Sequence, residues 1–161
     1  MSVAVVTGIA LCVISVFGAR DAILYNPSHS IPEGFYARAS GPLVSGAIVT
    51  VRAVDVSPNY AALRDFTEPG DRFIKRVVAA RGQEICGRGS EISIDGITIV
   101  HRLKRDAAGR DLPRWEGCRV LGQGEFLLLG DTADSFDGRY WGPVSAQVIE
   151  GVWRPLQFGV H

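Results

Sequence analysis

The sequence has no excess of charge of either sign, because 17 lysine and arginine residues balance 17 aspartate and glutamate residues. A chain without net charge has no overall field that would attract nucleic acid or an anionic membrane surface. Nucleic-acid binding is therefore not expected. Internal repeats and low-complexity tracts are also lacking, so the 161 residues are expected to form one domain with its own core.

Cysteine is scarce, and its positions do not suit a metal site. Cys12, Cys86 and Cys118 form no C-x-x-C pair and no cluster with histidine at zinc-site spacing. Neither a metal nor another cofactor is expected. Because Cys12 lies inside an apolar run, Cys86 and Cys118 are the only pair that could form a disulfide in an oxidising compartment. The sequence leaves open whether they are bonded or are two unbridged core residues.

Charged residues are absent from Ser2 to Ala19. As a helix this apolar run would span about 26 Å, enough with its flanking residues to cross a bilayer. We expect a transmembrane anchor over residues 3–19. A cleavable signal peptide is the main competing interpretation, although no lysine or arginine precedes the run. A buried core helix is disfavoured because the run has no polar face. Arg20 follows the run and by itself would favour a cytoplasmic C-terminal side, but a single charge does not determine the orientation in the membrane.

After the apolar run, 19 glycines and eight prolines separate short runs of Val, Ile and Leu. This composition favours a mainly β domain with little helix. The Asn26-Pro27 step would end any preceding helix, so we place the domain at 26–161. The segments expected to contain strands are 43–54, 72–80, 124–131 and 147–158.

The links between these strands are also readable. Asp95-Gly96 lies between two alternating apolar segments and predicts a hairpin over residues 90–100. Residues 56–71 read as a loop with a short helix, and residues 101–117, which are polar and basic, as an exposed loop and not a binding patch.

Three stretches carry reactive side chains, and each has an ordinary explanation when taken alone. In SHSIPEGFY (28–36) the serines suit a turn, and in GDRFIKRVV (70–78) the lysine could extend from a strand into water. In GDTADSFDGRYWGPV (130–144) the acidic and basic residues could hold a turn by an ion pair. The argument for chemistry depends on combining them.

Lys75 is the candidate base. On a strand, Phe73 and Val77 share its face, so the amine is expected to lie among apolar side chains. Burial would lower its pKa from about 10.4 towards 7 or 8, where a neutral amine can accept a proton. Arg76 has a comparably apolar face, but a guanidinium does not release its proton.

Ser30 is the candidate nucleophile, and a serine hydroxyl needs a neighbouring base. His29 is adjacent in sequence, so in an extended stretch it points to the opposite side. His101 lies in the charged loop and His161 is the last residue. A Ser/His/Asp triad is therefore disfavoured, and Ser30 with Lys75 is the preferred dyad.

The three stretches carry a family resemblance. Their order, N-x-S-x-S-x-P-x-G-x-Y, then G-D-x-x-x-K-R-V, then G-D-x-x-x-S-x-D-x-R-Y-W-G, is similar to the type I signal peptidase superfamily. The single residue between the serine and the proline resembles its conjugative-transfer branch, the TraF-like pilin-processing peptidases. The resemblance implies a coiled antiparallel sheet or barrel, preceded by one transmembrane helix in the bacterial inner membrane, with the domain facing the periplasm.

Matched position by position, the resemblance makes Ser30 the acylating nucleophile and Lys75 the general base. Ser28, where the transfer branch often has threonine, matches the hydroxyl that assists the Ser30 backbone N–H in binding the oxyanion. The stretch between Lys75 and Gly130 is short beside that of large leader peptidases, which indicates a domain without their large insertion.

The third motif supplies the supporting residues in the same match. Ser135 would orient the lysine amine, and Asp131 would brace its loop. Asp137 and Arg139 alternate with Ser135, so in an extended segment they would share its side, and the resemblance makes them a structural ion pair behind the site. Asp137 also lies in the part of the motif that the family uses for cyclisation.

The sequence therefore predicts a membrane-anchored Ser/Lys endopeptidase that cleaves an exported pilin-type precursor after a small residue, for conjugative transfer or type IV secretion. Hydrolysis and cyclisation of the product both stay open. One alternative is a general signal peptidase acting on many secreted proteins, and another is an inactive membrane-tethered component of a secretion apparatus. A self-cleaving repressor is disfavoured because it would carry a DNA-binding domain in place of the apolar run. A protein substrate is the expected partner, and the oligomeric state is left open.

Overall fold

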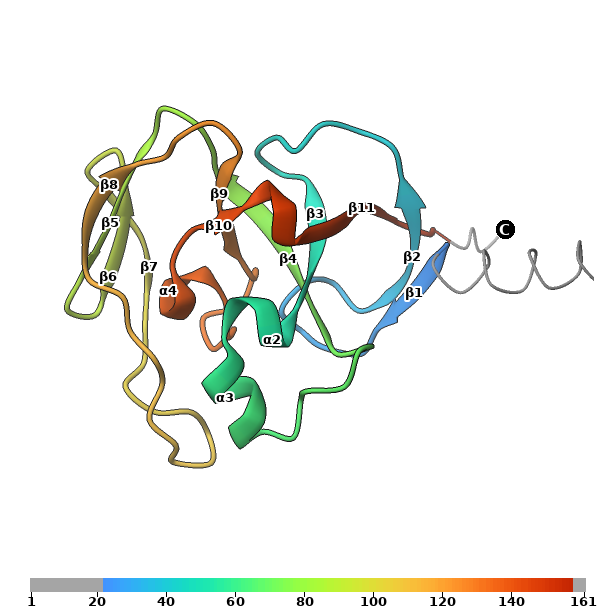
Figure 1. Cartoon of the computed structure of the whole chain (residues 1–161), viewed down its shortest axis with the longest axis horizontal. Helices are drawn as coiled ribbons and strands as arrows, with labels where there is room; N and C mark the ends of the chain where they lie inside the picture. The colour runs from blue at the N-terminus through green and yellow to red at the C-terminus, as the bar shows by residue number, and fades with distance from the viewer. Residues whose placement is uncertain (1–21, 158–161) are drawn as a thin grey trace, which may run out of the picture.

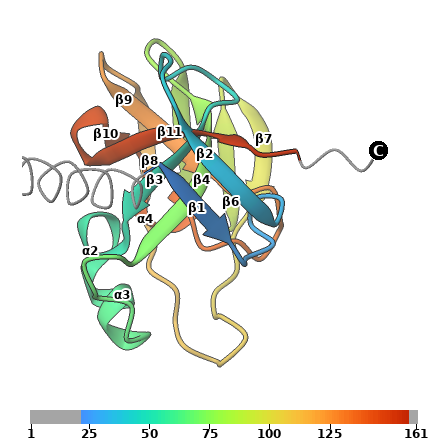
Figure 2. The same ribbon diagram turned by 90° about the vertical axis from the view of Figure 1, so that its right-hand side faces the viewer.

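Two antiparallel sheets make up most of the regular structure in residues 22–157, which the computed structural model of the chain describes (Figures 1 and 2). The larger sheet contains, in spatial order, β1 (Ile23–Asn26), β2 (Gly34–Ala39), β11 (Ile149–Pro155), β3 (Ile48–Arg52), β4 (Arg72–Ala79), β9 (Glu125–Leu129) and β10 (Val144–Ser145). The smaller sheet contains β7 (Ile97–His101), β6 (Glu91–Ile94), β5 (Glu84–Arg88) and β8 (Gly117–Val120). Every strand pairing in these residues is antiparallel, which confirms the mainly β fold.

The helices of residues 22–157 are single turns or little more: α2 (Ala53–Val56), α3 (Pro58–Leu63), α4 (Gly138–Trp141) and the 3₁₀ turn η1 (Ala146–Val148). Pro58 begins α3, where its fixed φ suits a first helical position and its missing N–H costs nothing. These helices confirm the short helix expected within residues 56–71. None of the helices that residues 22–157 form is long and apolar enough to cross a membrane, and the anchor expected at 3–19 lies outside the described residues.

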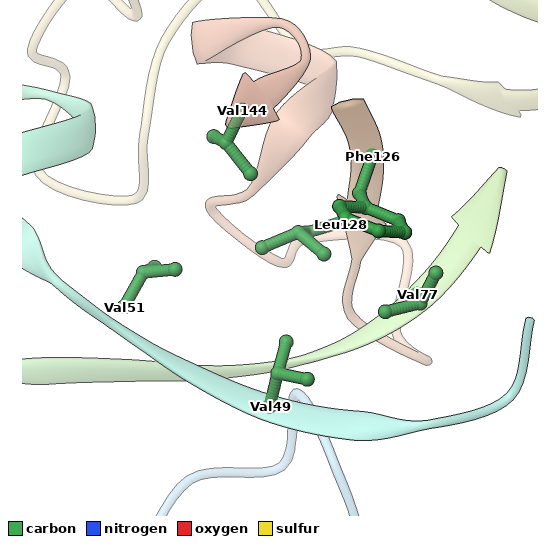
Figure 3. Close-up of a cluster of buried hydrophobic side chains, with 6 residues drawn as sticks. All are labelled: Val49, Val51, Val77, Phe126, Leu128 and Val144. Carbon is green, nitrogen blue, oxygen red and sulfur yellow. The ribbon is translucent and has the colours of Figure 1, made fainter. Parts of the chain in front are cut away.

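The main core lies where β3, β4 and β9 run side by side at the centre of the larger sheet. β3 is buried on both faces along IVTV, because neighbouring strands and the packed layers cover it. Figure 3 shows the side chains that meet there, which are Val49, Val51, Val77, Phe126, Leu128 and Val144. β-Branched and aromatic residues suit such a pleated, buried surface. This packing fixes the strand that carries Lys75.

The smaller sheet is built on the hairpin that the sequence predicts. Asp95 and Gly96 both have positive φ, 50° and 80°, and join Ile94 to Ile97 across the turn. Two consecutive residues with positive φ give the tight turn whose twist matches antiparallel strands. The predicted hairpin is confirmed.

A disulfide joins β5 and β8, two neighbouring strands of the smaller sheet. Cys86 on β5 and Cys118 on β8 are directly opposite in the register, with Cα atoms 4.1 Å apart. Of the two interpretations that the sequence left open, the structure has the bonded one.

The long loop between β7 and β8 is less exposed than expected. Arg102 is buried, and its guanidinium donates to the carbonyls of Gly89 (2.8 Å) and Trp115 (2.6 Å) and pairs with Glu116 (2.6 Å). The expectation of an exposed loop is wrong at Arg102, because a guanidinium whose three nitrogens all have hydrogen-bond acceptors can be buried. The rest of the loop extends beside α3 (Figure 1).

Candidate active site

Ser30 lies in a tightly held loop between β1 and β2. Ile31 is fully buried beneath the loop, and the Tyr36 hydroxyl donates to the Pro32 carbonyl at 2.5 Å. The backbone N–H of Asp131 donates to the Ser30 carbonyl at 2.6 Å, so the third motif contacts the first. These contacts position the serine before any substrate binds.

Lys75 lies on β4, between β3 and β9, and only 3% of it is exposed. Its Nζ lies 2.8 Å from Ser30 Oγ, across a separation of 45 residues in sequence. The ring of Phe73, on the same face of the strand, is centred 5.7 Å from Nζ. The structure therefore brings the predicted nucleophile and base within hydrogen-bonding distance.

Burial lowers the pKa of Lys75 from 10.5 to about 8, because the charged amine loses its hydration. Asp137 and Asp131 act in the opposite direction, since their negative charges favour the ammonium, and Arg139 adds to the lowering. Desolvation is the largest of these effects. A substantial neutral fraction near pH 8 makes the amine usable as a base.

The histidines that the structure describes do not contact Ser30. The His29 side chain is 86% exposed and pairs with Glu33, with Nδ1 2.5 Å from Oε1. His101 is exposed at the end of β7. His161 lies outside the described residues. Within residues 22–157, Lys75 is the basic side chain that reaches the serine.

Ser28 lies beside the nucleophile, with its Oγ 3.0 Å from Ser30 Oγ. Its hydroxyl also donates to Asn26 Oδ1 at 2.9 Å, so its proton is directed away from the cleft. The Ser30 N–H has no acceptor among the described residues. A hydroxyl and a free N–H therefore lie together where an oxyanion would need donors.

Ser135 is buried in the wall of the same cleft, close to the chain segment that holds Ser30. A Cβ on Gly130 would lie 2.0 Å from Ser135 Oγ and 2.9 Å from the Ser30 carbonyl, so only glycine fits between them. Ser135 Oγ has no hydrogen-bond partner among residues 22–157. The structure thus places Ser135 in the site but gives it no hydrogen bond to Lys75, and its orienting role stays a prediction.

Asp131, whose bracing role stays a prediction, pairs with a residue that the sequence did not indicate. Its two carboxylate oxygens accept from Arg76 Nε (2.9 Å) and Nη2 (2.7 Å). The two charges keep the pKa of Asp131 low and that of Arg76 high, mainly through these hydrogen bonds. Because Arg76 follows Lys75 on β4, one strand positions both the base and this ion pair. No sequence pattern marked Arg76, since its alternation resembles that of Lys75.

Asp137 and Arg139 form an ion pair that is almost completely buried, with exposures of 0% and 1%. Arg139 Nε and Nη2 reach the two carboxylate oxygens at 2.8 and 2.9 Å, and Asp137 also accepts from the Gly130 N–H at 2.7 Å. The remaining guanidinium donors reach the carbonyls of Ala133 (2.6 Å) and Thr132 (3.0 Å).

Asp137 and Arg139 pair, as the resemblance implied, but the condition for sharing a side with Ser135, an extended segment, is not met. Asp137 is the N-cap of α4, and Arg139 lies on that helix. The aspartate side chain accepts the Arg139 N–H at 3.0 Å, and such side-chain capping of the first turn competes well with an extended chain. The ion pair therefore closes a helical turn beside the loop that carries Ser135.

The candidate nucleophile and base open onto a cleft of about 490 Å³. Its walls include Ser28, Ser30, Lys75, Ser135, Phe66, Phe73, Phe136, Arg64, Arg72 and Asp134. Phe73 and Phe136 belong to an aromatic cluster with Tyr60, Tyr140 and Trp141, whose rings lie 4.0–5.6 Å apart. Phe73 is the member of this cluster that lies beside the Lys75 amine. No group of His, Cys, Asp and Glu within residues 22–157 has the arrangement of a metal site.

The family model of the signal peptidases, peptidase S26, matches residues 1–156 of the chain. The chain belongs to this family. Membership of this family implies a serine peptidase.

Two relatives of this S26 protein are plasmid transfer proteins TraF from Escherichia coli. One is 36% identical over 146 residues, covering 81% of this chain and 80% of the relative. The other is 31% identical over 167 residues, covering 94% of this chain and 92% of the relative. The resemblance to the TraF-like branch is confirmed. A crystal structure of a signal peptidase I from Enterococcus faecalis matches with a TM-score of 0.41 at 17% identity, covering 71% of this chain and 98% of that one.

Proposed function

We propose that this S26 protein is a membrane-anchored serine endopeptidase that processes an exported pilin-type precursor for conjugative transfer. The observation that carries the proposal is the 2.8 Å contact between Ser30 Oγ and a lysine that is 97% buried. Similarity to two plasmid transfer proteins supports a role in transfer. The Cys86–Cys118 disulfide supports a domain outside the cytoplasm, on the periplasmic side of an inner membrane that residues 3–19 would cross once.

In the proposed reaction, Ser30 Oγ attacks the scissile carbonyl while its proton passes to neutral Lys75 Nζ. The oxyanion of the tetrahedral intermediate accepts a hydrogen bond from the Ser30 N–H. It accepts a second one from the Ser28 hydroxyl, once that hydroxyl has turned away from Asn26. Collapse of the intermediate breaks the peptide bond, and the lysine ammonium gives its proton to the leaving amine. An ester between Ser30 and the substrate is left.

The second half of the reaction uses the same two groups. Lys75, neutral again, takes a proton from the attacking nucleophile, and Ser30 leaves as the alcohol with a proton returned from the ammonium. Water gives a linear product, whereas the N-terminal amine of the same substrate gives a cyclic product. The two products differ by the mass of one water molecule.

Mass spectrometry of the pilin-like protein encoded near this chain tests the function. Co-expression with the wild-type chain should convert the precursor to a shorter form, and a Ser30→Ala variant should leave it full length, because the hydroxyl is the acyl acceptor. Ser90→Ala, an exposed serine in the turn between β5 and β6, is the matched control and should process normally. Full processing by the Ser30→Ala variant would exclude this serine as the nucleophile.

The same measurement separates the proposed enzyme from a general signal peptidase. An unrelated secretory preprotein is supplied as a second substrate. A dedicated pilin peptidase should leave it uncleaved, whereas a general signal peptidase should remove its signal peptide. The mass of the pilin product further shows whether water or an amine resolves the acyl-enzyme.

The pH dependence of cleavage should report the lysine. Only neutral Lys75 can accept the serine proton, and the pKa of this amine is lowered to about 8, so kcat/KM of the solubilised full chain should rise with pH through about 8 and then level off. A rise that begins only near pH 10 would indicate an amine in water. Full activity down to pH 6 would indicate a different base.

A further inference from the structure

The side chain of Asn26, the last residue of β1, contacts the loop that carries Ser30 at several points, and no role has yet been assigned to it. The side chain is buried, with 3% exposed. Its Nδ2 donates to the carbonyls of Ser28 (2.9 Å), Ile31 (2.8 Å) and Pro32 (3.2 Å). Its Oδ1 accepts from the backbone N–H of Ser28 (3.1 Å) and from its hydroxyl (2.9 Å). All five contacts lie within residues 28–32.

These contacts end a continuous series of hydrogen bonds that begins at the candidate base. Lys75 Nζ lies 2.8 Å from Ser30 Oγ, which lies 3.0 Å from Ser28 Oγ, which lies 2.9 Å from Asn26 Oδ1. An amide oxygen can only accept, so it fixes the direction of the series from one end. The Ser28 proton is directed to Asn26, so while Lys75 is protonated the ammonium donates to Ser30 and Ser30 donates to Ser28. When Lys75 is neutral, the single Ser30 proton turns to Nζ, and Ser28 stays held by Asn26.

We propose that Asn26 is a positioning residue that holds the Ser28 hydroxyl beside Ser30 in the free enzyme and yields it to the oxyanion during acylation. An oxyanion is a stronger acceptor than a neutral amide oxygen, because hydrogen bonds to ionised groups are shorter and stronger. The hydroxyl therefore turns about its own C–O bond and needs no backbone movement. The two Nδ2 hydrogens, shared among the three carbonyls, keep the loop in place while the hydroxyl turns. The catalytic part of this inference rests on the proposed peptidase function.

The side chain at position 26 needs both halves of an amide. Leucine has nearly the same shape but would leave the carbonyls of Ser28 and Ile31 and the Ser28 hydroxyl without this buried partner, while the Pro32 carbonyl would keep the Tyr36 hydroxyl. An ionised aspartate would keep the acceptor but would direct negative charge at those carbonyls. Asparagine donates on one side and accepts on the other, which matches the loop and Ser28 at once.

The test combines kinetics with a crystal structure of the full chain, using Asn26→Ala, or Asn26→Leu should the alanine variant not fold. We expect kcat for precursor cleavage to fall about 10²-fold, because the Ser28 hydroxyl is no longer held where the oxyanion forms. KM should change little, because the cleft that binds the precursor keeps its shape. In a double-mutant cycle, adding Asn26→Ala to Ser28→Ala should cost little further activity, since Asn26 acts through Ser28. Independent, multiplicative losses would overturn the inference.

Asn59→Ala is the matched control, because Asn59 is the only other asparagine of the chain and is exposed on α3. Its kcat should stay near that of the wild type. Tyr36→Phe removes a different hydrogen bond to the Pro32 carbonyl without a contact to Ser28, and a loss equal to that of the Asn26 variant would overturn the specific role of Ser28.

The crystal structure of the Asn26 variant shows the position of the Ser28 hydroxyl directly, without any activity measurement. Ser28 Oγ should leave hydrogen-bonding distance of Ser30 Oγ, while Ser30 stays in contact with Lys75. An unmoved Ser28 would overturn the inference even for an active enzyme. A displaced Ser28 in the variant, together with a wild-type chain that cleaves no precursor, would support the positioning and refute the proposed function.

Discussion

A Lys75→Met variant is expected to lose precursor cleavage and yet to unfold at a higher temperature than the wild type at pH 7. The activity should fall by about 10²–10⁴-fold, the usual contribution of a general base. Methionine fills nearly the same volume without a charge, so the β4 core around Phe73 should stay packed. The gain in stability arises because the wild-type ammonium is held out of water.

The size and the pH dependence of this gain follow from the lowered pKa. A shift from 10.5 to about 8 corresponds to about 3 kcal/mol of destabilisation while the amine is protonated. Below pH 8 the amine is charged in both the folded and unfolded chain, so the whole cost is present. Between pH 8 and 10.5 the folded chain releases its proton first and the cost disappears. Thermal unfolding across this range should show the advantage of the variant narrowing as pH rises.

Lys104→Met provides a matched control, since Lys104 is the only other lysine of the chain and is exposed. It should change neither activity nor stability by a measurable amount, because an exposed ammonium keeps its hydration. A Lys75→Met variant that is less stable than wild type at pH 7 would show that the amine contributes favourable interactions beyond its cost of burial. A variant that still cleaves would exclude Lys75 as the base.

Alternation and turn residues are local signals, so the sequence predicted strands in the segments that hold β3, β4, β9 and β11, and the β6–β7 hairpin. It did not predict β1, β2, β5, β8 and β10, which lie outside those segments. The Asp95-Gly96 hairpin, the strand that carries Lys75 and the short helix after β3 all follow from residues close in sequence. The association of Ser30 with Lys75 was predictable only by combining the chemistry of the two side chains with the order of the motifs. Neither side chain is informative by itself.

The partners that fix the site were not predictable, because they depend on which loops meet in space. Arg76 reaches Asp131 across 55 residues, and no spacing rule predicts that pairing. The contact of Asn26 with Ser28 has the local spacing of an Asx turn, but its link to Lys75 through Ser30 depends on the fold. The sequence analysis did not predict the helical turn at Gly138–Trp141. A capping aspartate and a buried arginine favour the helix, and burial is a property of the fold, not of the segment.

Arg139→Met is expected to destabilise the protein by about 3–5 kcal/mol, because it leaves the Asp137 carboxylate buried without its counter-ion. The variant also leaves the carbonyls of Thr132 and Ala133 without the guanidinium donors that now hold this loop. Urea unfolding at pH 7 should show the loss. Since the same loop carries Ser135, cleavage by the folded fraction should also fall.

The double variant Asp137→Asn/Arg139→Met separates the charge from the packing. An uncharged amide can still accept from the Gly130 N–H and cap α4, so removing the orphaned charge should recover part of the lost stability. The double variant should therefore be more stable than the single Arg139→Met variant, although it carries one more substitution. If the two substitutions destabilise additively, the guanidinium acts through its backbone contacts alone. The ion pair would then be a brace for the loop, and its buried charge would have no separate role.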